Sequence, residues 1–398
     1  MDRFIPRELE THLKEMAGWF PVVALTGPRQ SGKSTLIRRA FSDYTYLTLE
    51  NPQTRAFARE DPVGFITDNP SHLVIDEAQY APDLFSMIQV ASDERGDAGQ
   101  YILTGSQNFL MMKSIGQSLA GRVGLLKLLP LSYREVKNAS LEPVGIDEFA
   151  LKGGYPRLYD SNIPPVHYFP NYLETYIERD VAGLLDVRNK RSFRTFLEIC
   201  AQNAGNLINM TSIARHTGVS LPTIKSWLSI LESSYIAFTL PPYFSNARKR
   251  LTKTQKLYFF DTGLLCHLLK IETLEQLLSH QSFGAVFENL VVAETAKNHI
   301  HEGRQPELYF YRDDSKREVD LLDFTDSGSH YAVEVKSSRT FQRKFARHLS
   351  SVCDELGIDI ENRFVVARVE ASYRIAECNV TSAKDWLCGM KGSTGQQA

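Results

Sequence analysis

The chain has 398 residues with a formal net charge of −2; 43% of the residues are hydrophobic and 23% are charged. This composition is that of a soluble globular protein, and the length predicts two or three domains. It excludes a membrane-spanning protein, because no apolar run reaches the roughly 18 residues that a span needs.

The cysteines and the first residues narrow the class of protein further. The five cysteines are scattered without CxxC spacing, which argues against a disulfide framework and against a zinc site. Charged residues interrupt the first twenty positions, so we predict no signal peptide there and expect a cytoplasmic location. The net charge does not indicate a polyanion partner, although residues 188–194 and 241–256 carry several basic side chains and no acid.

A glycine-rich loop lies between a predicted strand at 22–26 and a predicted helix at 33–41. It reads GPRQSGKS, the P-loop pattern in its required strand–loop–helix context. The glycines let backbone N–H groups point at phosphate oxygens, Lys33 adds a cation, and the Ser34 hydroxyl is placed to ligate Mg²⁺. We therefore predict an ATP and Mg²⁺ site. The expected ATP-binding residues are Gly27, Pro28, Arg29, Gln30, Ser31, Gly32, Lys33, Ser34 and Thr35.

Further apolar runs alternate with helical stretches after the P-loop. This alternation predicts an α/β fold with a parallel sheet covered on both faces. The runs that we interpret as strands are 44–49, 73–75, 101–104 and 125–129.

Polar residues follow two of these strands. Asp76 and Glu77 end the strand at 73–75, beside the expected P-loop, so Asp76 is predicted to hold Mg²⁺ through water. Glu77 is the natural general base for the attacking water. Thr104 ends the next strand and is predicted to orient that water between Glu77 and the γ-phosphate; the alternative is a simple turn.

The motifs GPRQSGKS, VIDEAQ and ILTGSQN, in this order, resemble a large prokaryotic family of AAA+-type ATPases. The match continues through residues 120–122, 130–135 and 153–156, and through Arg179 and Asp180. The resemblance implies a homo-oligomer, such as a ring with the ATP site at the subunit interface. It also implies a C-terminal domain of the nuclease-like type described below.

In such ATPases an arginine of the same or a neighbouring subunit often stabilises charge on the γ-phosphate. We expect Arg122 to have this role. Arg134, Arg157 and Arg179 are the competing candidates.

Residues 211–231 form a helix-turn-helix pattern, with Gly218 at the turn and Ser220 as the cap of the second helix. Four apolar residues at helical spacing should face its core: Ile224, Trp227, Leu228 and Leu231. Strands predicted at 236–240 and 257–260, with a basic stretch between them, complete the layout of a winged helix that binds DNA phosphates. The expected DNA-binding residues are Thr223, Lys225, Arg248, Lys249, Arg250 and Lys253. A rigid protein–protein module is the alternative.

The last part of the chain has the residue spacing of a PD-(D/E)xK nuclease core. Asp320 precedes Glu334-x-Lys336, whose two side chains project from one face of a predicted strand, and Glu288 lies on a preceding amphipathic helix. Asp320 and Glu334 would hold Mg²⁺ against a scissile phosphate, and Lys336 would orient the attacking water or offset charge. A surface salt-bridge cluster is the alternative, and resemblance of fold does not settle cleavage.

The predicted domains follow from these motifs. They are an AAA+-type ATPase core (1–145), a helical lid (146–205), a winged helix (206–264), a nuclease-fold domain (265–390) and a disordered tail (391–398). The leading hypothesis is an ATPase that remodels or translocates on DNA, with branched or junction DNA among the compatible targets. The two alternatives are an ATP-controlled metal-dependent nuclease and an ATPase switch that acts on protein partners.

Overall fold

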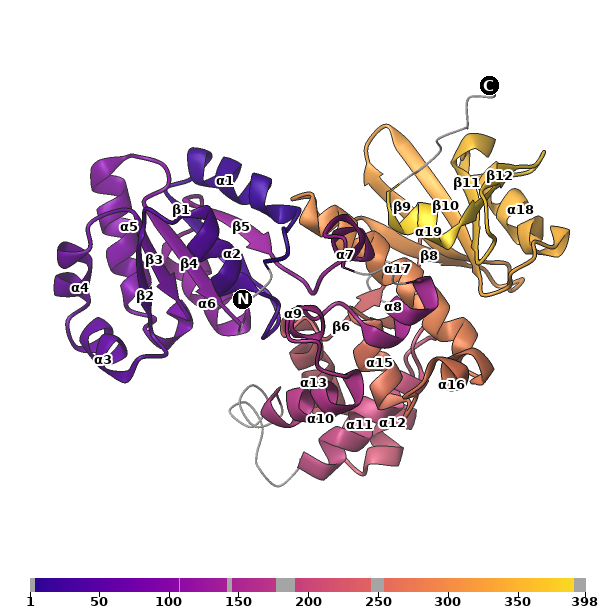
Figure 1. Cartoon of the computed structure of the whole chain (residues 1–398), viewed down its shortest axis with the longest axis horizontal. Helices are drawn as coiled ribbons and strands as arrows, with labels where there is room; N and C mark the ends of the chain where they lie inside the picture. Colours follow the sequence, from indigo (N-terminus) through magenta and orange to yellow (C-terminus); the bar gives the residue numbers. More distant parts are fainter. Residues whose placement is uncertain (1–3, 107, 142–144, 177–189, 245–253, 390–398) are drawn as a thin grey trace.

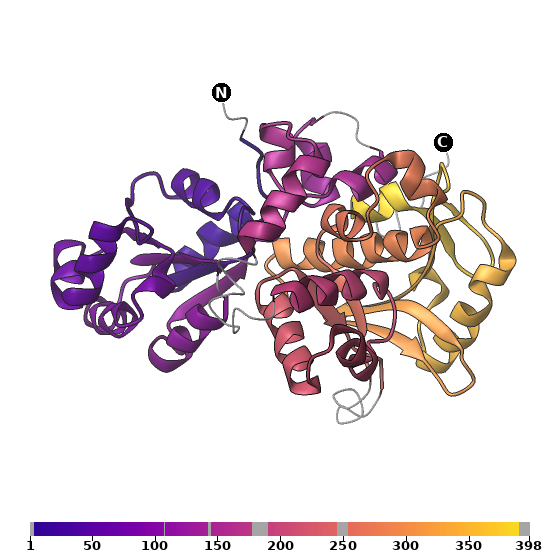
Figure 2. The same ribbon diagram turned by 90° about the horizontal axis from the view of Figure 1, so that it is seen from below.

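The computed structural model describes residues 4–106, 108–141, 145–176, 190–244 and 254–389. A sheet with its helices forms one lobe from the N-terminal part of the chain (Figure 1). A second sheet lies at the opposite end of the molecule, with helices between the two (Figure 2). Several residues named above lie outside the described ranges: Arg179, Asp180, Arg248, Lys249, Arg250, Lys253 and 391–398.

The N-terminal lobe is built on a five-stranded parallel sheet in the order β2-β3-β4-β1-β5. Every residue of β1, β3 and β4 is buried, as expected of strands covered on both faces. The predicted parallel sheet is confirmed, although the fifth strand begins two residues earlier than expected, at Val123. The strands are β1 (Val22–Thr26), β2 (Thr45–Thr48), β3 (Leu73–Asp76), β4 (Tyr101–Gly105) and β5 (Val123–Lys127).

Helices cover both faces of this sheet, because alternate residues of a strand point to opposite sides. Val23 and Leu25 share one apolar cluster with α1 (Leu9–Trp19) and α2 (Lys33–Ala40). Val22 and Ala24 face the other side. The helices on that side are α3 (Pro52–Glu60), α4 (Pro62–Asp68), α5 (Leu84–Arg95) and α6 (Asn108–Ser118), and the short η1 (Ala78–Tyr80) follows β3.

The middle of the chain is largely helical. α12 ends at Gly218, whose φ is 71°, and α13 begins after Ser220, whose hydroxyl accepts from the Thr223 N–H at 3.3 Å. The two strands that follow, β6 and β7, pair antiparallel. The elements are α7 (Tyr133–Asn138), α8 (Ile146–Lys152), α9 (Arg157–Asp160), α10 (Pro165–Tyr176), α11 (Lys190–Gln202), α12 (Met210–Thr217), α13 (Leu221–Ser233), β6 (Ala237–Leu240) and β7 (Lys256–Phe259).

The C-terminal part forms a six-stranded sheet in the order β12-β13-β11-β10-β9-β8. β9 pairs antiparallel with both β8 and β10, whereas β10, β11 and β13 run parallel. Its strands are β8 (Leu308–Arg312), β9 (Glu318–Asp326), β10 (Ser329–Lys336), β11 (Arg363–Ala367), β12 (Tyr373–Arg374) and β13 (Asn379–Ser382). Its helices are α15 (Thr262–Leu268), α16 (Leu274–Ser279), α17 (Phe283–His301), η4 (Arg343–Ala346), α18 (Arg347–Leu356), η5 (Ile360–Asn362) and α19 (Ala383–Leu387).

One apolar cluster joins the middle and C-terminal parts. It contains Phe169 of α10, Trp227 of α13, Leu290 of α17 and Phe364 of β11. The apolar core therefore continues across residues 205 and 264, where we predicted domain boundaries. These boundaries stay predictions. No helix among the described residues is long and apolar enough to cross a membrane.

Candidate active site

The P-loop follows the carboxyl end of β1 and leads directly into α2. A Cβ on Gly27 would lie 2.1 Å from the carbonyl oxygen of Leu128, so no larger residue fits there. Gly32 has a φ of 94°, in the region that favours glycine, and α2 begins at the next residue. Because the first N–H groups of a helix lack partners within it, the loop and the start of α2 form an anion-binding cradle.

Lys33 lies over this cradle. Its buried ammonium donates to the carbonyl oxygens of Gly27 and Pro28, at 2.9 Å each. The loop opens on a cavity of about 540 Å³, which is within the usual size range of small-molecule sites. The P-loop residues on its wall are Arg29, Gln30, Gly32, Lys33, Ser34 and Thr35, and Asp76 and Glu77 line it as well.

Three hydroxyl groups hold Asp76 at the carboxyl end of β3. Ser34 Oγ donates to Asp76 Oδ2 at 3.0 Å, and the Tyr46 and Thr104 hydroxyls donate to the same carboxylate. Burial and the hydrogen bond to Asp76 raise the pKa of Tyr46 to about 12, so this hydroxyl keeps its proton. A hydroxyl beside a carboxylate is a donor pair that suits Mg²⁺, so these residues fit the predicted ion.

Glu77 follows Asp76 with a left-handed backbone, at φ 58°. This conformation is uncommon for a residue other than glycine, and such strain is concentrated at functional sites. The carboxylate of Glu77 lines the cavity and accepts hydrogen bonds from Gln79 Nε2 and, at 3.3 Å, from Ser106 Oγ. The backbone therefore directs the predicted general base toward the nucleotide cavity.

Thr104 lies beside Asp76 and Glu77. Its side chain is fully buried behind Asp76 and donates to that carboxylate, and it does not line the cavity. It is the residue before the last one of β4, and its hydroxyl also accepts from the Glu77 N–H at 3.5 Å. Thr104 therefore contacts both acids, and its predicted role toward the water stays a prediction.

The candidate arginines lie in different parts of the molecule. Arg122 precedes β5, at the edge of the sheet away from the P-loop, and its Nη2 donates to Asp93 Oδ2 at 2.9 Å. A strand of five residues spans about 16 Å, so Arg122 does not reach the P-loop of its own chain. Arg157 of α9 instead lines the nucleotide cavity, and Arg134 pairs with Glu8.

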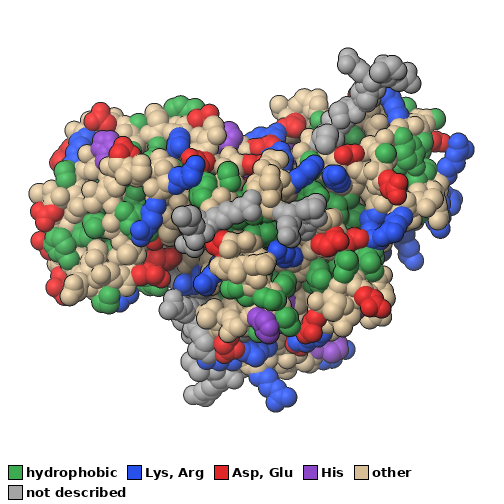
Figure 3. All heavy atoms as spheres, viewed as in Figure 1, with side chains coloured by type: hydrophobic (Ala, Val, Ile, Leu, Met, Phe, Trp, Pro, Cys, Tyr) green, Lys and Arg blue, Asp and Glu red, His purple; other side chains and the backbone are tan. Residues whose placement is uncertain are grey.

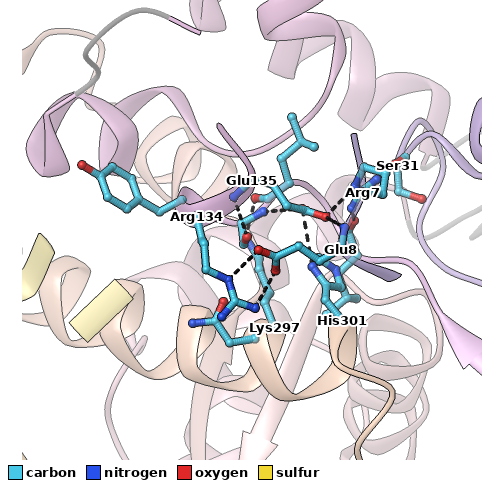
Figure 4. Close-up of polar contacts among 12 residues, drawn as sticks. Arg7, Glu8, Ser31, Arg134, Glu135, Lys297 and His301 are labelled. Atoms are coloured by element: carbon cyan, nitrogen blue, oxygen red, sulfur yellow. Dashed lines mark hydrogen bonds and ion pairs between the residues drawn. The ribbon is translucent and has the colours of Figure 1, made fainter. Parts of the chain in front are cut away.

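Arg7 supports the P-loop from behind and was missed by the sequence analysis. Its guanidinium donates to the carbonyl oxygens of Ser31 and Leu129, at 2.7 Å each, and to Glu135 Oε1 at 3.0 Å (Figure 4). Burial would raise the pKa of Glu135, but the charge of Arg7 lowers it to about 2. No motif surrounds Arg7, so the sequence carries no signal for this contact.

Buried His301 of α17 completes this polar group on the C-terminal side, with Nδ1 3.4 Å from Glu135 Oε2. Possible ligand atoms of Glu8, Glu135 and His301 lie within 4.8 Å of one another. Arg134 and Arg7 already pair with the two carboxylates. The two arginines therefore balance the charge of the two carboxylates. Together with His301, these residues connect the P-loop to α17.

The structure also brings together the four polar residues predicted in the C-terminal part. Lys336 Nζ is 2.5 Å from Glu334 Oε1 and 3.5 Å from Asp320 Oδ2, and the Val335 N–H donates to Asp320 at 2.8 Å. Burial and then the charge of Asp320 raise the pKa of Glu334 to about 8 and that of Glu288 to about 7. These carboxyl groups therefore hold protons near neutral pH, because too many acids share a buried space.

Lys256 and Glu318 join this acidic cluster and were not predicted as part of it. Lys256 belongs to the basic stretch that the sequence analysis assigned to the wing, but the structure makes it the first residue of β7. Its Nζ lies 2.7 Å from Glu318 Oε1 and 3.2 Å from Glu288 Oε1. A lysine within the otherwise apolar segment KLYF was the signal available in the sequence.

Of the predicted DNA-binding residues, the described ranges include Thr223 and Lys225 on α13. Lys225 is exposed, whereas Ile224, Trp227, Leu228 and Leu231 are buried as predicted. Trp227 packs edge-on against Phe193 of α11. The polar face of α13 is therefore directed to solvent.

The parallel sheet, the P-loop and the acids beside it define a P-loop ATPase fold. Residues 20–137 match the family described as AAA domain. Residues 145–275 and 283–386 match two further families, each described as a domain of unknown function (DUF8612 and DUF4143).

The chain belongs to the same family as an uncharacterised protein of Mycobacterium tuberculosis, to which it is 31% identical over 338 residues, covering 84% of this chain and 74% of that protein. An uncharacterised protein of Methanocaldococcus jannaschii is 24% identical over 377 residues, covering 87% and 81% of the two chains. Among solved structures, a Walker-type ATPase of Pyrococcus abyssi is 16% identical, covers 67% of this chain and 96% of its own, and has a TM-score of 0.45.

Proposed function

We propose that the protein hydrolyses ATP in a Mg²⁺-dependent reaction and uses the turnover to remodel DNA or to translocate along it. The observation that carries the hydrolytic part is the joint placement of Lys33, Asp76 and Glu77 on one cavity wall. A site that only bound nucleotide would need the P-loop but not a strained glutamate beside it.

The residues divide the reaction among them. Lys33 and the loop N–H groups bind the β- and γ-phosphates, and Ser34 and Asp76 would hold Mg²⁺, which neutralises phosphate charge. Glu77 accepts a proton from the water that attacks the γ-phosphorus, and the bond to the bridging oxygen breaks to release ADP. Arg157 on the cavity wall is placed to offset charge on the γ-phosphate within the same chain.

The DNA part of the proposal is supported by the middle elements. We interpret α11, α12, α13, β6 and β7 as a winged helix whose exposed α13 residues, including Lys225, meet the nucleic acid. Tyr235, between α13 and β6, hydrogen-bonds at 2.8 Å to Thr26, the residue before Gly27. This contact is a direct route from the nucleotide site to the proposed DNA-binding element.

The charge on the surface limits what kind of DNA contact to expect. On the face in Figure 3, basic and acidic side chains of the described residues are interspersed. We therefore expect a small contact through α13 and the wing, with no broad basic surface on this face. Because the salt dependence scales with the number of phosphates contacted, binding should depend only weakly on salt.

ATP turnover measured with duplex, single-stranded and branched DNA tests the proposal. We expect at least one of these DNAs to raise the rate severalfold. A rate that none of the three changes would remove the DNA part, and no turnover at all would remove the hydrolytic part.

A metal-dependent nuclease is the second candidate. It is supported by Lys336, which lies near both Asp320 and Glu334, and by Glu288, which shares Lys256 with Asp320. Asp320→Ala and Lys336→Ala should each abolish any nicking seen with Mg²⁺ or Mn²⁺. Absence of nicking in the parent protein on all DNA forms would favour a binding role for this domain.

A further inference from the structure

A lysine from the middle of the chain lies inside the acidic cluster of the C-terminal part. The Lys256 side chain is only 4% exposed, and its ammonium lies 2.7 Å from Glu318 Oε1, 3.2 Å from Glu288 Oε1 and 4.0 Å from Asp320 Oδ1. Burial would lower the pKa of Lys256, but these three carboxylates raise it above the usual value for lysine. The side chain is therefore a fixed cation within the cluster.

Strand β7 delivers this cation in a defined position. Tyr258 lies two residues further along the strand, on the same face, and its hydroxyl donates to Glu288 Oε1 at 2.7 Å. Asn289 of α17 forms two hydrogen bonds with the backbone of Phe259, at 2.8 Å each. Hydrogen bonds from side chains to side chains and to the backbone therefore hold β7 against α17.

The cluster still contains more acid than base. Glu288, Glu318, Asp320 and Glu334 face Lys256 and Lys336, with Arg312 at the rim 3.7 Å from Glu318. Four acidic side chains therefore face three basic ones. In addition, Glu334 Oε2 is buried without a hydrogen-bond partner in the described structure. The cluster is thus able to accept more positive charge than it holds.

We propose that Lys256 is an internal counter-ion that competes with a divalent metal ion for Glu288 and Asp320. A metal ion binds carboxylate oxygens at about 2.0–2.6 Å, and the ammonium already lies 3.2 Å from Glu288 Oε1 and 4.0 Å from Asp320 Oδ1. Two positive centres a few ångströms apart repel each other strongly in a buried site. A metal ion therefore enters only when Lys256 leaves, which couples metal binding to movement of β7.

This inference rests on the proposed C-terminal metal site and is independent of ATP hydrolysis. In this proposal Lys256 occupies the carboxylates until the middle element moves. Displacement of β7, for example when DNA binds α13 and the wing, would open the cluster.

Mn²⁺ binding to the full chain without nucleotide, followed by the electron paramagnetic resonance signal of free Mn²⁺, tests the proposal. Binding that Asp320→Asn removes is assigned to the cluster. We expect Lys256→Met to bind this Mn²⁺ at least tenfold more tightly than the parent chain. The matched control is Lys270→Met, which removes an exposed lysine paired with Glu198.

Equal or weaker Asp320-dependent binding in Lys256→Met would overturn the competition while leaving the metal site intact. No Asp320-dependent binding in either chain would overturn the metal site as well. Lys256→Gln gives a second test through thermal unfolding: Mn²⁺ should raise its melting temperature more than that of the parent. If Lys256→Met or Lys256→Gln folds only when Mn²⁺ is present, the proposal is supported. If these variants remain unfolded at saturating Mn²⁺, the proposal is contradicted.

Discussion

Gly27 is the residue at which the P-loop backbone has least room. A methyl group there would meet the carbonyl oxygen of Leu128, which belongs to the chain leaving β5 and cannot rotate away. We expect Gly27→Ala to weaken binding of a fluorescent ATP analogue at least tenfold. Gly116→Ala is the control, because a Cβ at Gly116 meets nothing within 4 Å. Unchanged affinity in Gly27→Ala would mean that the loop adapts freely.

Arg7 donates three hydrogen bonds, one of them to the P-loop residue Ser31, and neutralises buried Glu135. Arg7→Met leaves that carboxylate without its partner, a change that costs about 3–5 kcal/mol in buried pairs. Urea unfolding should show this loss of free energy. Arg122→Met is the matched control and should change stability far less, because Arg122 and Asp93 are solvent-exposed. Equal losses in the two variants would contradict the account of Arg7.

Residues inside local motifs were predictable, because the chemistry of phosphate binding fixes their type and spacing. Asp76 and Glu77 could be assigned from their place after a buried strand. Tyr46 and Arg7 could not, because their partners lie 24 or more residues away and no short pattern encodes the contact. The hydrogen-bond partner of Thr104 was not predictable for a related reason: its position near a strand end was right, but the direction of its hydroxyl depends on the neighbouring strand.

At the scale of elements, the helix α17 and the strands β9 and β10 share a cluster whose stability should depend on pH. The pKa of Glu334 is about 8 in the folded chain against an ordinary 4.5. Between these values the unfolded chain ionises while the folded chain keeps the proton, so stability falls as pH rises through this window.

Glu334→Gln removes this titration. Its free energy of unfolding, measured in urea at pH 5 and at pH 8, should improve relative to the parent at the higher pH. A difference between the two chains that does not change with pH would rule out the raised pKa. Asp354→Asn is the control, because Asp354 is exposed on α18.

Continuous apolar runs predicted the ends of the strands in the N-terminal sheet to within two residues. The reason is that strands buried on both faces contain few polar residues. β7 shows where this reasoning fails. Its first residue is a lysine, which the sequence analysis placed in the basic wing, and only the acids of α17 and β9 make its burial acceptable.

At the scale of the whole molecule, Arg122 tests whether subunits share the ATP site. Its place at the end of the sheet away from the P-loop predicts that Arg122 acts on the ATP of a neighbouring subunit. Mixing Glu77→Gln with Arg122→Ala chains should then restore part of the ATP turnover, because mixed interfaces contain one intact site. Mixed oligomers that stay inactive would contradict this role.

The overall arrangement was the least predictable feature. Local patterns indicated separate units, whereas α17 shares one apolar cluster with helices of the middle part and with strands of the C-terminal sheet. Contacts such as Tyr235 with Thr26 join residues more than two hundred positions apart. Packing of this kind depends on the shapes of complete elements, which a reading of local periodicity does not contain.

The most direct test of the account is ATP binding and hydrolysis by Glu77→Gln. The change removes the proton acceptor but leaves Lys33, Ser34 and Asp76 in place, so nucleotide affinity should stay within about threefold, well under 1.4 kcal/mol, while turnover falls by about 10²–10⁴. Glu94→Gln on the exposed end of α5 is the control and should match the parent in both measurements. Turnover by Glu77→Gln at the parent rate would contradict the assigned base.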